Sequence, residues 1–174
     1  MSDTRKELLM DLRTLRNSIN LEKKIWLNRY TTNCYAYALG LDIPEYRIID
    51  GAYAPGTISR SPIDLTTVTT FTYKELMNNL YMDLESLGID FQKVSPNASI
   101  SPDEWKIAVY TSASWGKLED YHFLRIYGDD GWSHKNGWRE MPTHKDDADE
   151  IIRNPRWCYL SNRDYRMCLK LKLK

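Results

Sequence analysis

The chain has 174 residues, and its 24 lysines and arginines balance its 24 aspartates and glutamates to a formal net charge of zero. This balance removes the general electrostatic attraction to nucleic acid or to an anionic membrane surface, so we expect neither as a partner. A chain of this length buries roughly 70% of its surface on folding, which is enough for one hydrophobic core. We therefore expect a single domain over residues 1–174.

The sequence favours a cytoplasmic protein. No apolar run approaches the length of about 18 residues that a membrane-spanning helix needs. The first residues, Met-Ser-Asp-Thr-Arg-Lys-Glu, carry acids and bases in place of the apolar core of a signal peptide. The three cysteines, Cys34, Cys158 and Cys168, are odd in number and widely spaced, which argues against a disulfide framework and for a reducing compartment.

Helical signals dominate the first half of the chain. Leucines and an isoleucine at spacings of three and four predict a helix over 3–19, which packs on the domain or docks a partner. Thr and Asn before position 34 and Gly40 after it predict a short helix over 34–39. Turn signals without periodicity predict a loop over 42–66, and a leucine stripe predicts a second helix over 73–87.

Strand signals dominate the second half. The predicted strands are 105–111, 121–127, a return strand 132–135 after the Gly128–Gly131 hairpin turn, and an alternating, half-buried strand over 166–174. Helices followed by consecutive strands predict an α+β fold, with the N-terminal helices packed on an antiparallel sheet.

Cys34 stands at the predicted start of the helix 34–39. There its thiol would face unpaired backbone N–H groups and the positive end of the helix dipole, which favour the reactive thiolate and lower the pKa. The same N–H groups could donate to an oxyanion. A lone cysteine in such a position can also be a small buried hydrophobic residue.

His122 and His134 flank the predicted hairpin turn, so they become near-opposite neighbours on antiparallel strands. The second imidazole can then orient the first, which is the role of the third member of a catalytic triad. Two alternatives stay open: a pair of solvated histidines at a sheet edge, or a zinc site with Cys34 as the third ligand. His144, in a polar loop, is expected to be solvated.

The order of these residues resembles the NlpC-type branch of the papain-like cysteine peptidases. The strings that carry the resemblance are Asn33-Cys34-Tyr-Ala-Tyr-Ala-Leu and His122-Phe-Leu-Arg-Ile-Tyr-Gly-Asp-Asp-Gly-Trp-Ser-His134-Lys. They look like uncharacterised bacterial and phage proteins of this type. The resemblance implies a papain-like fold in which 1–30 form an N-terminal helical extension and 31–174 the catalytic core.

The resemblance also implies roles for single residues. Cys34 is the expected nucleophile, His122 the general base and acid, and His134 the orienting residue, with Asp129, Asp130 and Asn136 as substitutes for His134. The candidates for oxyanion or substrate binding are Tyr30, Asn33, Trp132 and Arg125, although Arg125 can also be an exposed strand residue. Neither a metal nor a cofactor is implied.

The expected function is a cysteine-dependent hydrolase, a peptidase or amidase of the Cys-His-His type that cleaves an amide bond through a thioester. Its substrate would be a peptidoglycan stem peptide or a protein side-chain or isopeptide bond, in the cytoplasm of a bacterium or a phage-infected host cell. The alternative is a catalytically silent papain-like binding protein, an inhibitor or phage anti-defence factor that docks a partner through the helix 3–19.

Overall fold

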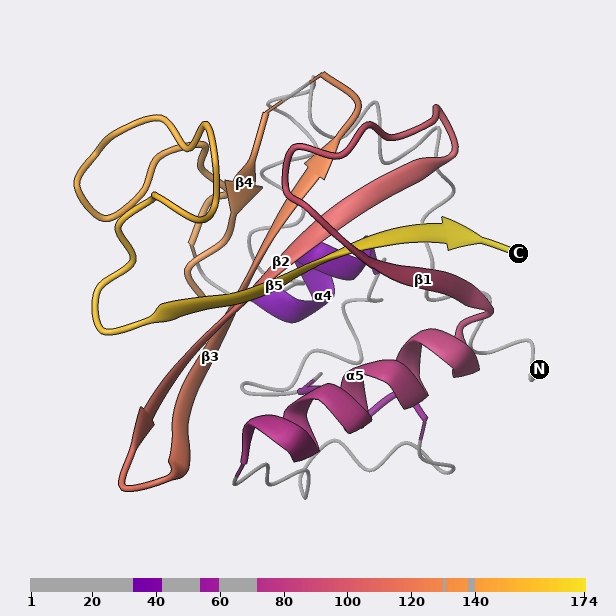
Figure 1. Ribbon diagram of the computed structural model, residues 1–174, viewed down its shortest axis with the longest axis horizontal. Helices are drawn as coiled ribbons and strands as arrows, with labels where there is room; N and C mark the ends of the chain where they lie inside the picture. Colours follow the sequence, from indigo (N-terminus) through magenta and orange to yellow (C-terminus); the bar gives the residue numbers. More distant parts are fainter. Residues whose placement is uncertain (1–32, 42–53, 60–71, 130, 138–139) are drawn as a thin grey trace.

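The computed structural model of the chain describes residues 33–41, 54–59, 72–129, 131–137 and 140–174 (Figure 1). The predicted helix 3–19, Tyr30 and most of the predicted loop 42–66 lie outside these ranges. The division of the chain after residue 30 therefore stays a prediction. Among the helices of the described ranges, none is long and apolar enough to cross a membrane.

The described residues form one five-stranded antiparallel sheet with the strand order β1-β5-β2-β3-β4. The strands are β1 Ile89–Val94, β2 Glu104–Ser114, β3 Lys117–Tyr127, β4 Ser133–His134 and β5 Asp164–Leu173. The predicted strands are confirmed, and β1 is an additional one. The C-terminal strand β5 lies between β1 and β2, so residues far apart in the sequence meet at the centre of the sheet (Figure 1).

Two helices pack on this sheet, as the predicted α+β arrangement requires. Helix α5, Tyr73–Ser86, begins with a capping box in which Thr72 and Glu75 satisfy each other's backbone N–H groups. Helix α4, Cys34–Leu39, is short because Asn33 caps its start and Gly40, in the left-handed region at φ 68°, ends it. All six residues of α4 are buried.

Both faces of the sheet are covered. The core under the helices contains Tyr35, Leu39, Leu76, Leu80, Leu84, Ile107, Val109, Phe123, Leu169 and Leu171. A second core on the opposite face contains Ala108, Tyr110, Leu124, Trp132, Ile152, Leu160 and Cys168. The prediction that β5 is half-buried is therefore wrong at Cys168, because the chain beyond β4 returns over that face of the sheet.

A buried carboxylate fixes the start of α4. Asp83 of α5 accepts a hydrogen bond from the Tyr35 hydroxyl at 2.7 Å and others from the backbone N–H groups of Gly56 and Ser59, both at 2.7 Å. Gly56 has φ +98°, and a Cβ there would lie 2.9 Å from Cγ of Asn79. Through Tyr35, this cluster positions the neighbouring residue Cys34.

Candidate active site

Cys34 is the first residue of α4, as predicted, and its side chain is 9% exposed. Burial raises the pKa of its thiol to about 11, although backbone hydrogen bonds from Phe123 and Tyr35 act in the opposite direction. The prediction of a lowered pKa is therefore wrong for this structure. The physical reason is that the desolvation of the thiolate outweighs the N–H groups of a single short helix.

The two predicted histidines lie together, in a register that differs slightly from the predicted one. His134 of β4 is directly opposite Leu124 of β3, so His122 is its diagonal neighbour on the same face of the sheet. The nitrogen atoms His122 Nε2 and His134 Nδ1 are 2.8 Å apart, and the rings are nearly perpendicular, at 87°. The predicted contact between the imidazoles is confirmed.

A backbone carbonyl determines which nitrogen carries each proton. His134 Nε2 lies 2.7 Å from the carbonyl oxygen of Lys145, which can only accept, so Nε2 carries the hydrogen. Burial lowers the pKa of His134, and burial, His134 and Arg163 hold the pKa of His122 well below its ordinary value. Both rings are therefore neutral at pH 7. His134 Nδ1 accepts from His122 Nε2–H, which leaves His122 Nδ1 as an unprotonated base.

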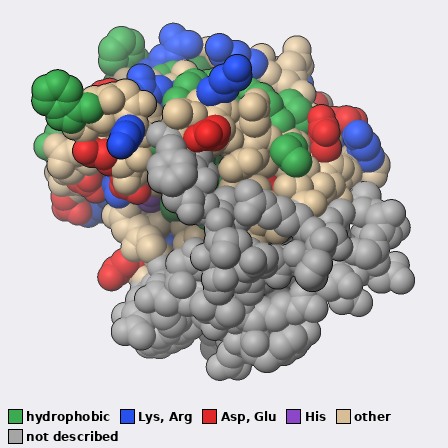
Figure 2. Space-filling view, turned by 90° about the horizontal axis from the view of Figure 1, so that it is seen from below, with side chains coloured by type: hydrophobic (Ala, Val, Ile, Leu, Met, Phe, Trp, Pro, Cys, Tyr) green, Lys and Arg blue, Asp and Glu red, His purple; other side chains and the backbone are tan. Residues whose placement is uncertain are grey.

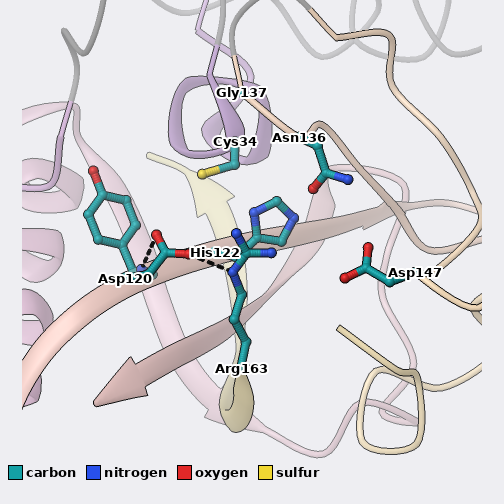
Figure 3. Close-up of a pocket in the computed structure, with 8 residues that line it drawn as sticks. Cys34, Asp120, His122, Asn136, Gly137, Asp147 and Arg163 are labelled. Atoms are coloured by element: carbon teal, nitrogen blue, oxygen red, sulfur yellow. Dashed lines mark hydrogen bonds and ion pairs between the residues drawn. The ribbon is translucent and has the colours of Figure 1, made fainter. Parts of the chain in front are cut away.

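A pocket with a volume of about 580 Å³ joins these groups (Figure 3). It is lined by Cys34, Asp120, Tyr121, His122, Asn136, Gly137, Asp147 and Arg163. His134 is fully buried and contacts His122 without lining the pocket, which is the position of an orienting residue. Among the described residues, no hydrogen bond joins the Cys34 sulfur to either ring.

Two predicted substrate-binding residues have structural roles instead. Arg125 is buried on the helix side of the sheet, where Nη1 donates to the carbonyl of Tyr37 at 2.9 Å and the guanidinium lies 3.7 Å from the centre of the Tyr37 ring. The interpretation of Arg125 as exposed or as a pocket residue is therefore wrong. Trp132 is part of the second core and does not line the pocket, with Lys106 Nζ 5.7 Å from its ring centre.

The remaining candidates also lie away from the pocket wall. The Asn33 side chain accepts from the backbone N–H of Ala36 at 2.9 Å, so it caps α4 and does not line the pocket. His144 is partly buried, with Nδ1 2.9 Å from the Trp132 carbonyl oxygen, so the expectation of a solvated ring is wrong. Tyr30 lies outside the described residues.

Arg163 lines the pocket, although no signal in the sequence predicted it there. It lies directly before β5, and its Nε donates to Asp120 Oδ2 at 2.7 Å at the edge of the pocket. No local motif marks Arg163, because its place depends on the pairing of β5 with β2. Sequence reasoning named Asn136 only as a substitute for His134 and missed Asp147, and both line the same pocket.

The zinc alternative has no support from the geometry. Within the part of the chain that the structure describes, no three His, Cys, Asp or Glu side chains are gathered closely enough to hold a metal ion. The three cysteines are free thiols in the described residues.

Comparisons with known proteins give no family assignment. No protein-family model matches the chain, and neither a curated protein nor a solved structure is significantly similar to it.

Proposed function

We propose that the protein is a cysteine-dependent hydrolase of the papain-like, NlpC type, with Cys34 as nucleophile, His122 as general base and His134 as orienting residue. The observation that carries the proposal is the directional chain of hydrogen bonds from His122 through His134 to the Lys145 carbonyl. These hydrogen bonds leave Nδ1 of His122 with a free lone pair. The His122 ring and the Cys34 thiol line the same pocket. A base oriented by a third group next to a nucleophile is the arrangement that covalent catalysis requires.

The reaction starts from a neutral thiol and a neutral imidazole. As the Cys34 sulfur bonds to the carbonyl carbon of an amide, its proton passes to His122 Nδ1, and the charge that develops on the oxygen is stabilised by N–H donors such as that of Cys34. His122 then gives the proton to the leaving amine as the C–N bond breaks. Water attacks the thioester and passes one proton to His122. His122 returns this proton to the Cys34 sulfur as the C–S bond breaks, which releases a carboxylic acid and restores the thiol.

The proposed substrate class is the one that the resemblance implies. A peptidoglycan stem peptide or a protein side-chain or isopeptide bond has the amide that this chemistry requires. The resemblance to bacterial and phage proteins, together with free thiols in the described residues, supports the cytoplasm of a bacterium or of a phage-infected cell as the compartment.

Alkylation of Cys34 tests the proposal without knowledge of the substrate. A thiol with a pKa near 11 and 9% exposure reacts slowly on its own, so rapid reaction with iodoacetamide at pH 7.5 requires His122. We expect mass spectrometry to find Cys34 modified first and His122→Ala to slow its modification about 100-fold. The matched controls Cys158→Ser and Cys168→Ser should leave the rate for Cys34 unchanged. Equal rates with and without the His122 ring would overturn the proposal.

A second function, the catalytically silent papain-like binding protein, is favoured by one observation. The raised pKa of Cys34, together with the lack of a hydrogen bond between its sulfur and the imidazoles of the described residues, is what an inactive scaffold would show. The alkylation experiment distinguishes the two functions, because Cys34 of a binding protein would not react with iodoacetamide. In that case the predicted helix 3–19, outside the described residues, is the first segment to test for partner capture.

A further inference from the structure

The Arg163 guanidinium is held firmly at one edge of the pocket. Its Nε donates to Asp120 Oδ2 at 2.7 Å, and the other oxygen, Asp120 Oδ1, accepts the backbone N–H of Tyr121 at 2.8 Å. The Arg163 side chain is only 24% exposed. Because both oxygens of the carboxylate are engaged, Asp120 fixes the plane of the guanidinium rather than binding a ligand itself.

The contact with Asp120 engages only one of the three nitrogen atoms of the Arg163 guanidinium. A guanidinium has five N–H groups, and the contact with Asp120 uses the one on Nε. No residue in the described ranges accepts a hydrogen bond from its two terminal amino groups. Figure 3 shows the guanidinium reaching the Asp120 carboxylate, and Arg163, Cys34 and His122 line the same pocket. Its charge also reaches His122, where it contributes to the lowered pKa.

The pocket has an uneven distribution of charge. Asp120 is paired with Arg163, so the carboxylate without a cation is that of Asp147, whose Oδ2 accepts the backbone N–H of Ser161 at 2.7 Å. An anionic ligand would be attracted to the terminal amino groups of Arg163 and repelled by Asp147.

We propose that Arg163 binds a carboxylate of the substrate next to the bond that is cleaved. The inference rests on the proposed function and adds a substrate class to it: amides that carry a free carboxylate close to the scissile carbonyl. Two parallel N–H donors match the two oxygens of a planar carboxylate, which a lysine ammonium does not do. Arg163 is therefore a specificity-determining residue, and His122 and Cys34 carry the chemistry.

Two alkylating agents of different charge test this inference. Iodoacetate carries a carboxylate and iodoacetamide a neutral amide of nearly the same size, so the ratio of their rates at Cys34 cancels changes in the reactivity of the thiol. We expect Arg163→Gln to lower the iodoacetate-to-iodoacetamide ratio about tenfold and Arg163→Lys to restore part of it. Arg166→Gln is the matched control, because Arg166 is on β5, pairs with Thr111 and Asp164, and does not line the pocket. It should change the ratio less than about twofold.

The outcomes separate this inference from the proposed function. An unchanged ratio in Arg163→Gln overturns the carboxylate site, whereas rapid, His122-dependent modification by iodoacetamide would still support the hydrolase. If Cys34 reacts with neither reagent, the proposed hydrolase function is refuted. A titration of the protein with acetate then tests whether Arg163 binds a carboxylate. A saturable shift of the Arg163 Nε–H resonance, absent in Arg163→Gln, supports the site, and no shift overturns it.

Discussion

His134 is the residue on which the orientation of the site depends. It is fully buried, its backbone pairs with Thr143 on one side and Leu124 on the other, and its two ring nitrogens are occupied by Lys145 and His122. The ring therefore has one position and one tautomer. A buried imidazole with both nitrogens paired stabilises the fold and, at the same time, determines where the free lone pair of His122 lies.

Replacement of His134 by alanine should separate these two effects. The change removes the acceptor of His122 Nε2–H, so the ring of His122 can rotate, and we expect Cys34 modification by iodoacetamide at pH 7.5 to slow at least tenfold. Urea unfolding should show that the free energy of unfolding falls by about 2 kcal/mol, because the change leaves unpaired polar groups and a cavity. His144→Ala is the matched control. It removes another imidazole, which is partly buried, but should leave the rate of Cys34 modification within about twofold. Equal slowing in both variants would contradict the role of His134.

At the residue scale, the sequence predicted the three central side chains but not their surroundings. Cys34, His122 and His134 could be named because local signals mark them: a capped short helix for Cys34 and a glycine-bounded hairpin for the two histidines. Arg125 was misplaced because strand alternation separates two faces of a sheet without telling which face is open, and here both are covered. Arg163 was missed because only long-range strand pairing brings it to the pocket.

At the scale of elements, the loop that follows β4 supports the histidines. Asp146, next to Lys145 in the chain, accepts three backbone hydrogen bonds: from Ala148 at 2.9 Å, Glu150 at 3.1 Å and Tyr159 at 2.8 Å. Burial opposes its ionisation, but these N–H groups hold the pKa of Asp146 below its ordinary value. The ionised carboxylate closes the loop that presents the Lys145 carbonyl to His134.

Asp146→Ala should therefore slow the modification of Cys34, although Asp146 does not line the pocket. Without its three hydrogen bonds the loop loosens, the Lys145 carbonyl no longer fixes His134, and we expect Cys34 modification to slow about fivefold, with its pH profile shifted. Asp149→Asn is the control in the same loop. It removes only the charge of an exposed ion pair with Lys145, keeps a residue type that tolerates the left-handed φ of 65° at this position, and should have little effect. A rate for Asp146→Ala equal to that of the unchanged protein would show that the loop does not orient His134.

The elements themselves were predictable to different degrees. The helix Tyr73–Ser86 was predicted because its cap and its leucine stripe are local features. Strand β1, Ile89–Val94, was not predicted, since only Ile89 is buried and no alternation of apolar residues marks it. Its place depends on pairing with β5 along its whole length. Strand β4 has two residues, too few for a pattern of their own, and it was predicted from the hairpin turn before it.

At the scale of the whole molecule, the site lies where two layers meet. Cys34 is part of the core under the helices, whereas His134 is opposite Leu124, which belongs to the core on the other face of the sheet. Helix α4, which begins with Cys34, contacts both β3 and the short edge strand β4. On the face that Figure 2 shows, acidic and basic side chains of the described residues are interspersed, in line with the zero net charge. The site thus depends on the correct packing of both layers.

The histidine pair links the stability of this packing to pH. The pKa of His122 and that of His134 are lowered in the folded state, so near pH 6 the unfolded chain binds more protons than the folded one. The free energy of unfolding contributed by these groups is present above about pH 6.5 and is lost as the pH falls below it. Urea unfolding between pH 7.5 and 5 should show this loss. His122→Gln should reduce the slope of the free energy of unfolding against pH. A slope that His122→Gln leaves unchanged would contradict the assignment of two neutral, buried rings.

The pH profile of Cys34 modification by iodoacetamide, measured with and without His122, tests the central claim most directly. If His122 takes the proton, the rate for the unchanged protein is level from about pH 7 to about pH 10, between the lowered pKa of His122 and the pKa of Cys34 at about 11. In His122→Ala the rate instead rises about tenfold with each pH unit over this range, because only free thiolate reacts. Parallel, rising profiles for both proteins would show that the imidazole does not activate the thiol, and Cys34 would then be a buried cysteine without a catalytic role.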